Sequence, residues 1–118
     1  LRKDVFQQCL VLYPESVWNE QMDALRARLS RWNPTHQQIF RQFVSDVEMV
    51  TLDSSGRLLM PRRYLQMAGI EQDIKFIGMG DTIEVWSNER TQQPFMEASD
   101  FGKALEEIMG ETATEATL

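Results

Sequence analysis

The residues whose types and spacing could support specific chemistry lie in one short stretch of the chain. Asp53 precedes Arg57 by four residues across a Ser-Ser-Gly turn, where a carboxylate can hold a guanidinium in one orientation through a bidentate pair. An arginine fixed in this way suits O6 and N7 of guanine, the commonest specific contact in the major groove of DNA. Arg62 and Arg63 follow Pro61 at the start of an expected helix, where they could bind phosphates. The predicted DNA-binding residues are Asp53, Ser54, Ser55, Gly56, Arg57, Arg62 and Arg63.

The same residues also fit a purely structural interpretation. Asp53 and Arg57 could form an ion pair that only holds a hairpin turn together, with Arg62 and Arg63 as solubilising surface charges. Residue types and spacing leave these two interpretations nearly equal in weight.

Groups that could carry catalysis or bind a metal are sparse. The single cysteine, Cys9, lies in an apolar segment, where buried and unreactive thiols are commoner than nucleophiles. The single histidine, His36, is expected on a helix surface or at a helix cap, so no histidine or cysteine cluster can form. No glycine-rich phosphate-binding motif occurs either. We therefore predict no enzyme activity, no cofactor, no metal site and no small-molecule substrate.

Charge is unevenly distributed along the 118 residues. The chain has 12 basic and 18 acidic side chains, a net charge of −6, but residues 97–118 alone contribute −5. Residues 54–70 contain three arginines and no acidic residue. Because DNA affinity grows with the number of phosphate contacts, one such patch binds weakly unless oligomerisation repeats it.

Length and composition limit the class of protein. A chain of 118 residues with 42% hydrophobic and 25% charged residues fits one globular domain, or two small halves that share a core. No apolar run approaches the ~18 residues needed to span a membrane. One cysteine makes an oxidising compartment unnecessary, so a cytoplasmic location is predicted.

The first half of the chain has the pattern of a strand followed by two helices. Residues 4–13 are rich in strand-forming side chains, and Pro14 ends that segment. Apolar residues at helical spacing predict an amphipathic helix over residues 15–30. Asn33-Pro34 interrupts it, and Thr35 is expected to cap a second helix.

The second half is expected to contain four short strands and one helix. Strands are predicted at 47–53, 58–60, 74–78 and 82–86, with a helix from Pro61 to about Met67. Four strands this short cannot bury both faces alone, so the unit needs a partner of its own kind. The expected core residues are Trp18, Leu25, Phe40, Phe43, Leu52, Leu59, Ile74, Phe76, Ile83 and Trp86.

A resemblance to one known protein family accounts for these patterns together. Residues 50–86, VTLDSSGRLLMPRRYLQMAGIEQDIKFIGMGDTIEVW, closely resemble the second repeat of the MraZ family, a branch of the AbrB-like swapped-hairpin DNA-binding proteins. The shared features are D-x-x-G-R, the apolar strand before Pro61, Ala68-Gly69 and the closing Ile-Glu-Val-Trp segment. The C-L-x-L-Y-P segment ending at Pro14 and the tryptophan at position 18 also match.

The resemblance implies an α+β fold, with AbrB-like swapped-hairpin β-units and two helices inserted between them. Residues 1–13 would be the remnant of a first unit, 14–46 the linking helices, 47–90 the second unit and 91–118 an acidic C-terminal helix and tail. Members of the family usually carry an earlier copy of the D-x-x-G-R motif, which does not occur in these residues.

The resemblance also implies a function. It predicts a cytoplasmic, nucleoid-associated transcription regulator of the bacterial division and cell-wall gene cluster, which binds repeated operator DNA as a ring-like homo-oligomer. The alternative is an oligomerisation or protein-interaction module without DNA binding of its own. The net charge of −6 favours that alternative.

Overall fold

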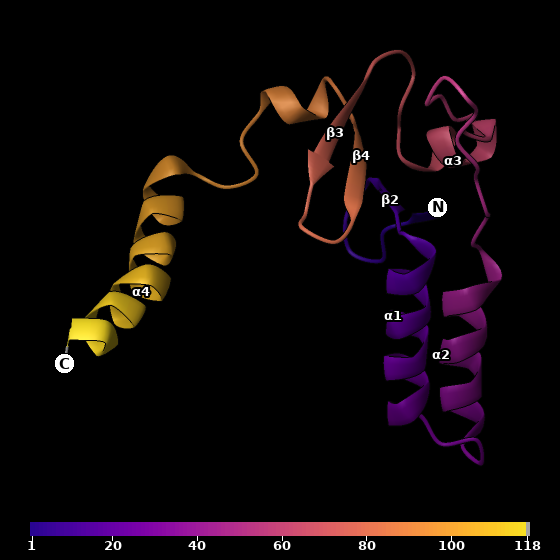
Figure 1. The fold of residues 1–118 in the computed structure, drawn as a ribbon, viewed down its shortest axis with the longest axis horizontal. Helices are drawn as coiled ribbons and strands as arrows, with labels where there is room; N and C mark the ends of the chain where they lie inside the picture. Colours follow the sequence, from indigo (N-terminus) through magenta and orange to yellow (C-terminus); the bar gives the residue numbers. More distant parts are fainter. Residues whose placement is uncertain (118) are drawn as a thin grey trace. The chain divides into compact units, whose positions relative to one another are not determined.

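The computed structural model describes the backbone of residues 1–117 and the side chains of residues 1–110. In chain order, the first unit contains β1 (Arg2–Lys3), β2 (Leu10–Leu12), α1 (Glu15–Arg28), α2 (Pro34–Ser45), α3 (Arg62–Met67), β3 (Ile74–Gly78) and β4 (Ile83–Ser87). The four strands form one antiparallel sheet in the order β1-β2-β4-β3 (Figure 1). The α+β class predicted from the sequence is confirmed.

The core lies where α3 packs against the central strands. Leu10 of β2, Val85 of β4 and Tyr64 of α3 are fully buried, and Ala68 and Ile70 close the cluster. Full burial of an aliphatic side chain is worth about 1.5–3 kcal/mol, so this small cluster is the main source of hydrophobic stabilisation. Gly69 ends α3 at a φ of +67°, as expected for a glycine at the C′ position.

The predicted core is largely wrong. Of its ten members only Trp86 is buried, and the four on α1 and α2 are half-buried. The remaining five are exposed: Leu52, Leu59, Ile74, Phe76 and Ile83. The physical reason is that the described residues of one chain contain no second layer to cover these side chains.

Helices α1 and α2 form an antiparallel hairpin that extends away from the sheet (Figure 1). Trp18 of α1 stacks on Phe43 of α2 with ring centroids 5.2 Å apart, and Tyr13 meets it edge-on at 5.4 Å. The predicted cap is wrong, because Asn33, not Thr35, accepts the first backbone N–H groups of α2. Asn33 is the cap because Pro34 occupies the first helical position, which places the cap two residues before Thr35.

Three predicted strand segments differ in the structure. Residues 5–9 bend instead of extending, because the Asp4 carboxylate accepts the backbone N–H groups of Phe6 and Gln7. Residues 47–53 and 58–60 form no strand within the described chain. Their only ladder-like pairing is between Leu1 and Glu48, which exchange two backbone hydrogen bonds of 3.0 Å. A strand needs a neighbour, and the rest of this stretch has none in the single chain.

The second unit begins at residue 89 and is described separately. It contains the 3-10 helix η1 (Arg90–Gln92) and α4 (Ala98–Thr117), joined by a segment that includes Pro94. Large apolar side chains on α4 are more than 45% exposed: Phe101, Leu105, Ile108 and Met109. Among the described residues no helix is long and apolar enough to cross a membrane. The four-segment division derived from the sequence stays a prediction.

Burial makes Cys9 chemically inert, as the sequence indicated. Its side chain is fully buried beside the sheet, and this burial, with a smaller effect from Glu84, raises the pKa of the thiol to about 12. At pH 8 the thiolate fraction is then roughly a thousand-fold lower than in the unfolded chain. We expect iodoacetamide to alkylate Cys9 only in urea. Rapid alkylation of the folded protein, measured by mass spectrometry, would contradict this placement.

Candidate nucleic-acid interface

Residues 53–57 form a tight, closed turn on the surface of the first unit. The backbone N–H of Asp53 donates to the carbonyl oxygen of Arg57 at 2.7 Å, and the N–H of Gly56 donates to the carbonyl oxygen of Asp53 at 3.0 Å. Gly56 has a φ of +79°, a conformation that other residues adopt only with strain. The turn predicted from the Ser-Ser-Gly sequence is confirmed.

The Asp53 carboxylate fixes the turn more than it fixes the arginine. Its Oδ1 atom accepts the backbone N–H groups of Ser55 and Arg57, both at 2.8 Å. Its Oδ2 atom lies 3.4 Å from Nε of Arg57. The bidentate pair predicted from the sequence is therefore wrong, because one carboxylate oxygen is occupied by the backbone amides. The contact of the guanidinium with Asp53 is made through Nε, so the terminal nitrogens of Arg57 are not used by a bidentate pair.

The tip of the turn is open to a ligand. The Arg57 side chain is 80% exposed, and Ser54, Ser55 and Gly56 are exposed as well. A Cβ atom built at Gly56 would meet nothing within 4 Å, so the glycine serves the backbone conformation and not internal packing. This arrangement presents one guanidinium from a short, hydrogen-bonded ridge, which is a geometry suited to the edge of a base or to a phosphate.

Arg62 and Arg63 lie at the start of α3 in different surroundings. Arg62 is exposed and has no ion pair within the described part of the chain. Arg63 contacts two carboxylates, with Nη1 2.7 Å from Asp46 and Nη2 3.6 Å from Glu48, and its guanidinium lies over the Tyr64 ring. Acidic residues therefore balance the charge of Arg63, and its predicted phosphate contact stays a prediction.

Asp46 and Tyr64 hold Arg63 in place, and sequence reasoning did not find them. The hydroxyl of Tyr64 donates to Oδ1 of Asp46 at 3.2 Å and accepts from Arg63 at 3.1 Å. The hydrogen bond from Arg63 is the main cause that lowers the pKa of Asp46. No sequence motif marks this cluster.

The lowered pKa of Asp46 gives a pH prediction. A carboxyl group with a depressed pKa in the folded state stabilises the fold fully above its unfolded value, and this contribution disappears as pH falls through the folded pKa. We expect Asp46→Asn to lower Tm by no more than about 4 °C at pH 7, since solvent screens this half-exposed pair. The difference in Tm between wild type and variant should shrink as pH falls below the ordinary pKa of an aspartate and disappear once Asp46 is protonated in the folded state. A difference in thermal melts that stays constant as the pH is lowered through this range would contradict this assignment.

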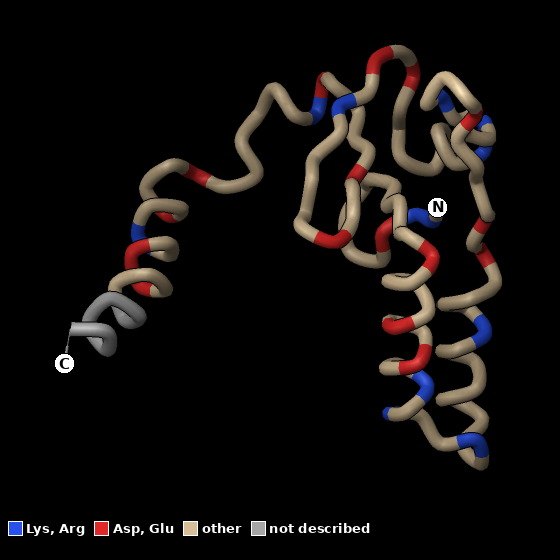
Figure 2. Tube along the Cα trace, in the orientation of Figure 1, with Lys and Arg blue, Asp and Glu red and all other residues tan. Residues whose placement is uncertain are grey.

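The arginines of the site lie on one side of the first unit. Figure 2 shows blue segments at the turn and at α3, where the tube of residues 54–70 carries no red. The site therefore combines a protruding arginine with two further arginines a few residues away. Within the described residues there is no group of histidine, cysteine and acidic side chains that could hold a metal ion.

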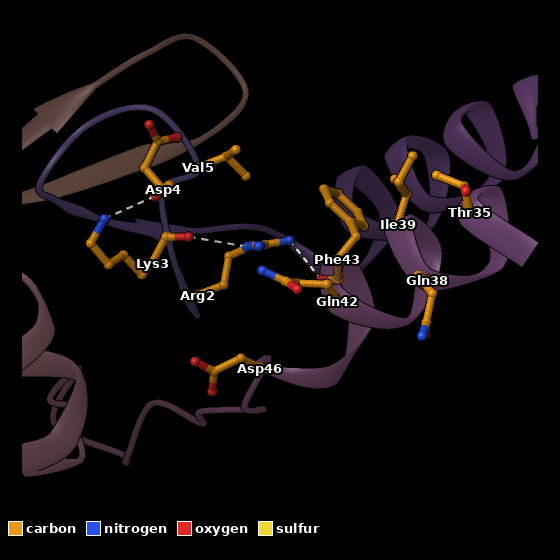
Figure 3. Close-up of a pocket in the computed structure, with 10 residues that line it drawn as sticks. All are labelled: Arg2, Lys3, Asp4, Val5, Thr35, Gln38, Ile39, Gln42, Phe43 and Asp46. Carbon is orange, nitrogen blue, oxygen red and sulfur yellow. Dashed lines mark hydrogen bonds between the residues drawn. The ribbon is translucent and has the colours of Figure 1, made fainter.

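An open pocket of about 640 Å³ lies between α2 and the N-terminal segment, and Asp46, the partner of Arg63, is one of its lining residues (Figure 3). Its most buried polar group, Arg2, donates to the carbonyl oxygens of Phe43 at 2.6 Å and Lys3 at 3.1 Å, and stacks over the Phe43 ring. Asp4 is used by the turn that follows it. These groups tie the sheet to α2, and they present no nucleophile paired with a base.

Comparisons with known proteins agree with this picture. Residues 43–109 match the family model described as "MraZ protein, putative antitoxin-like". The chain is 66% identical to the transcriptional regulator MraZ of Phocaeicola vulgatus over 110 residues, which is 93% of this chain and 71% of that protein. It is 62% identical to the transcriptional regulator MraZ of Bacteroides fragilis over 111 residues, 94% of this chain and 70% of that protein. A more distant relative of the same name, from Christiangramia forsetii, is 34% identical and also matches 93% of the chain and 71% of its own length. With a matching family model and these identities, the chain belongs to the MraZ family.

Proposed function

We propose that this chain is a DNA-binding transcriptional regulator of the bacterial division and cell-wall gene cluster, and that it acts on repeated operator elements. The observation that carries the proposal is the turn at 53–57, where a hydrogen-bonded ridge presents an Arg57 side chain that is 80% exposed. The relatives named as transcriptional regulators support the same function and offer no support for catalysis. Such a regulator works in the cytoplasm, at the nucleoid.

Each predicted site residue has a role in this proposal. Arg57 contacts guanine from the tip of the turn, and Asp53 keeps the turn closed through the backbone amides. Ser54, Ser55 and Gly56 form the ridge that approaches the DNA. Arg62 contacts a phosphate from the start of α3. Arg63, which also contacts Asp46 and Glu48, uses its remaining N–H donors to bind a second phosphate.

A ring-like homo-oligomer explains the apolar surface of the first unit. Leu59 is 88% exposed, Leu52 61% and Phe76 54%, although all three are large apolar side chains. The first two lie in extended segments that lack a strand neighbour within the described chain. Exposed apolar side chains beside unpaired backbone are a typical site of pairing with another chain. Such pairing would also repeat the DNA-binding turn, as binding to repeated operators requires.

The alternative, a protein-interaction module without DNA binding, is favoured by a different observation. Helix α4 carries exposed apolar side chains, including Phe101 and Leu105, among acidic residues. That combination repels DNA and fits an interaction with another protein. The two functions are separated by whether the chain binds DNA at all.

The salt dependence of binding tests the proposal. A duplex enriched by the chain from a random-sequence library and a shuffled duplex are compared by fluorescence anisotropy between 50 and 200 mM salt, a range over which phosphate contacts weaken strongly, by roughly an order of magnitude for a few contacts. Phosphate contacts by Arg62 and Arg63 should contribute about −2 for each copy to the slope of log affinity against log salt. A flat slope with equal affinity for both duplexes would overturn the proposal and leave the interaction module.

A further inference from the structure

The α1–α2 hairpin carries a second basic surface, larger in charge than the one around Arg57. Residues 24–45 contain four arginines and no acidic residue, a local charge of +4 against +3 for residues 54–70. The basic hairpin surface consists of Arg26, Arg31, Trp32 and Arg41: Arg26 and Arg31 line one hollow, and Arg41 lies one helical turn after Gln37, which lines the same hollow. Figure 2 shows blue segments on both helices of the hairpin and at the loop that joins them.

The charges of this surface are not neutralised within the described part of the chain. The ion pairs of the described residues involve Arg57 and Arg63, and none of the hairpin arginines takes part. Arg26 lies over the Phe40 ring at 5.2 Å, and Arg41 donates to the neutral side chain of Gln38 at 2.6 Å. Both contacts orient a guanidinium and leave its positive charge available to an external anion.

The loop at the end of the hairpin is held firmly by hydrogen bonds. His36 accepts the backbone N–H of Ser30 through Nδ1 at 2.9 Å, and the side chain of Gln37 donates to the carbonyl oxygen of Ser30 at 3.1 Å. Asn33 caps α2 from the same loop. Trp32 is therefore presented from an ordered loop, yet its side chain is 95% exposed. An indole held in solvent in this way is available to pack against a ligand.

A hollow of about 340 Å³ opens on this surface. Arg26 and Arg31 line it together with Leu29, Gln37 and Phe40. Two guanidiniums beside one concave site, with no carboxylate among the lining residues, favour a phosphate group over a neutral ligand.

We propose that the basic hairpin surface is a second DNA-contacting site, which binds the phosphate backbone without reading the bases. This inference rests on the proposed DNA-binding function and extends it to elements outside the D-x-x-G-R turn. Helix α1 has 14 residues and is therefore about 21 Å long, and it extends from the sheet away from the turn at 53–57 (Figure 1). The two sites can thus be disabled independently.

The test removes the two arginines that line the hollow. Arg26→Gln combined with Arg31→Gln is compared with Lys75→Gln combined with Lys103→Gln, which removes the same charge from exposed positions elsewhere. Because each lost phosphate contact lowers the salt slope by about one, the hairpin variant should lose about two from its slope. Its affinities for the enriched and the shuffled duplex should fall by the same factor. The control should keep the wild-type slope, and circular dichroism verifies folding of all variants.

The possible results separate a failure of the hairpin inference from a failure of the proposed DNA-binding function. A wild-type slope for the hairpin variant would overturn this inference alone, whereas wild-type protein that binds no duplex would remove the proposed function with it. A changed sedimentation coefficient with unchanged DNA affinity would overturn the inference in favour of a contact between copies.

Trp32 provides a second readout. Bound duplex should reduce acrylamide quenching of the wild-type tryptophan emission, and Trp32→Phe should abolish that reduction. Protection that persists in Trp32→Phe would overturn the placement of DNA at the hairpin.

Discussion

Arg57→Ala is expected to weaken binding to the enriched duplex by about 5- to 150-fold for each turn that contacts the DNA, which is the usual worth of a bidentate arginine–guanine contact. The affinity for a shuffled duplex should change much less, since only the enriched duplex places a guanine at the recognised position. The melting temperature should stay nearly the same, because the side chain is 80% exposed and its one ion pair is at the surface. An oligomer on repeated elements would multiply the loss.

Two further variants make this expectation specific. Lys75→Ala removes a positive charge from exposed residues of β3 and should leave both affinities close to the wild type. Asp53→Ala should lower affinity and also loosen the turn, because its carboxylate accepts two backbone N–H groups. If Arg57→Ala lowered only the melting temperature and not the DNA affinity of the folded protein, the ion pair would serve only to stabilise the turn.

Tyr64→Ala is expected to cost about 3–5 kcal/mol of unfolding free energy, the usual range for truncating a buried aromatic residue. The Tyr64 ring is fully buried among Leu10, Ala68 and Val85, and small domains are stable by only about 5–15 kcal/mol. The variant should therefore be close to unfolded at 37 °C. Tyr64→Phe should cost about 1 kcal/mol, since it removes only the hydroxyl that bonds to Asp46.

Urea unfolding followed by circular dichroism measures both changes. The matched control is Trp32→Ala, which truncates an aromatic side chain that is 95% exposed and should change stability by less than about 0.5 kcal/mol. Equal losses for Tyr64→Ala and Trp32→Ala would contradict the position of the core between α3 and the central strands.

Elements specified by short-range patterns could be predicted from the sequence. The helix expected at 15–30 is α1 (Glu15–Arg28), and the strand expected at 74–78 is β3 in full. Gly56 and Gly69 adopt the positive φ values that their turns require. Together with membership in the MraZ family, the α+β architecture agrees with the expected AbrB-like fold. These signals are local, so neighbouring residues alone are enough to produce them.

Features that depend on distant or external partners could not be predicted in the same way. Leu52 and Leu59 have strand-like patterns, but a strand also needs a neighbour, and these two residues have none among the residues that the structure describes. Tyr64 was missed as a core residue because a tyrosine in a six-residue helix beside two arginines has no apolar periodicity to mark it.

The sequence predicted which residues pair at the candidate site but not how they bond. Asp53 and Arg57 form an ion pair at a surface turn, as their residue types and spacing suggested. Its bonding differs because backbone N–H groups compete for the carboxylate, and a list of side chains does not show that competition. The arginines around Trp32 were not recognised as one surface because they lie on two helices and the loop between them. Only the folded hairpin brings them close together.

The most direct test of the central claim, that Arg57 reads a guanine, removes the acceptor from the DNA. Each guanine of the enriched duplex is replaced in turn by 7-deazaguanine, which lacks N7, and affinities are measured for the wild type and for Arg57→Ala. At one guanine in each element the replacement should weaken wild-type binding by about 5-fold or more and leave Arg57→Ala unaffected, since that variant no longer makes the contact. Equal losses for both proteins at every guanine would contradict base reading by Arg57.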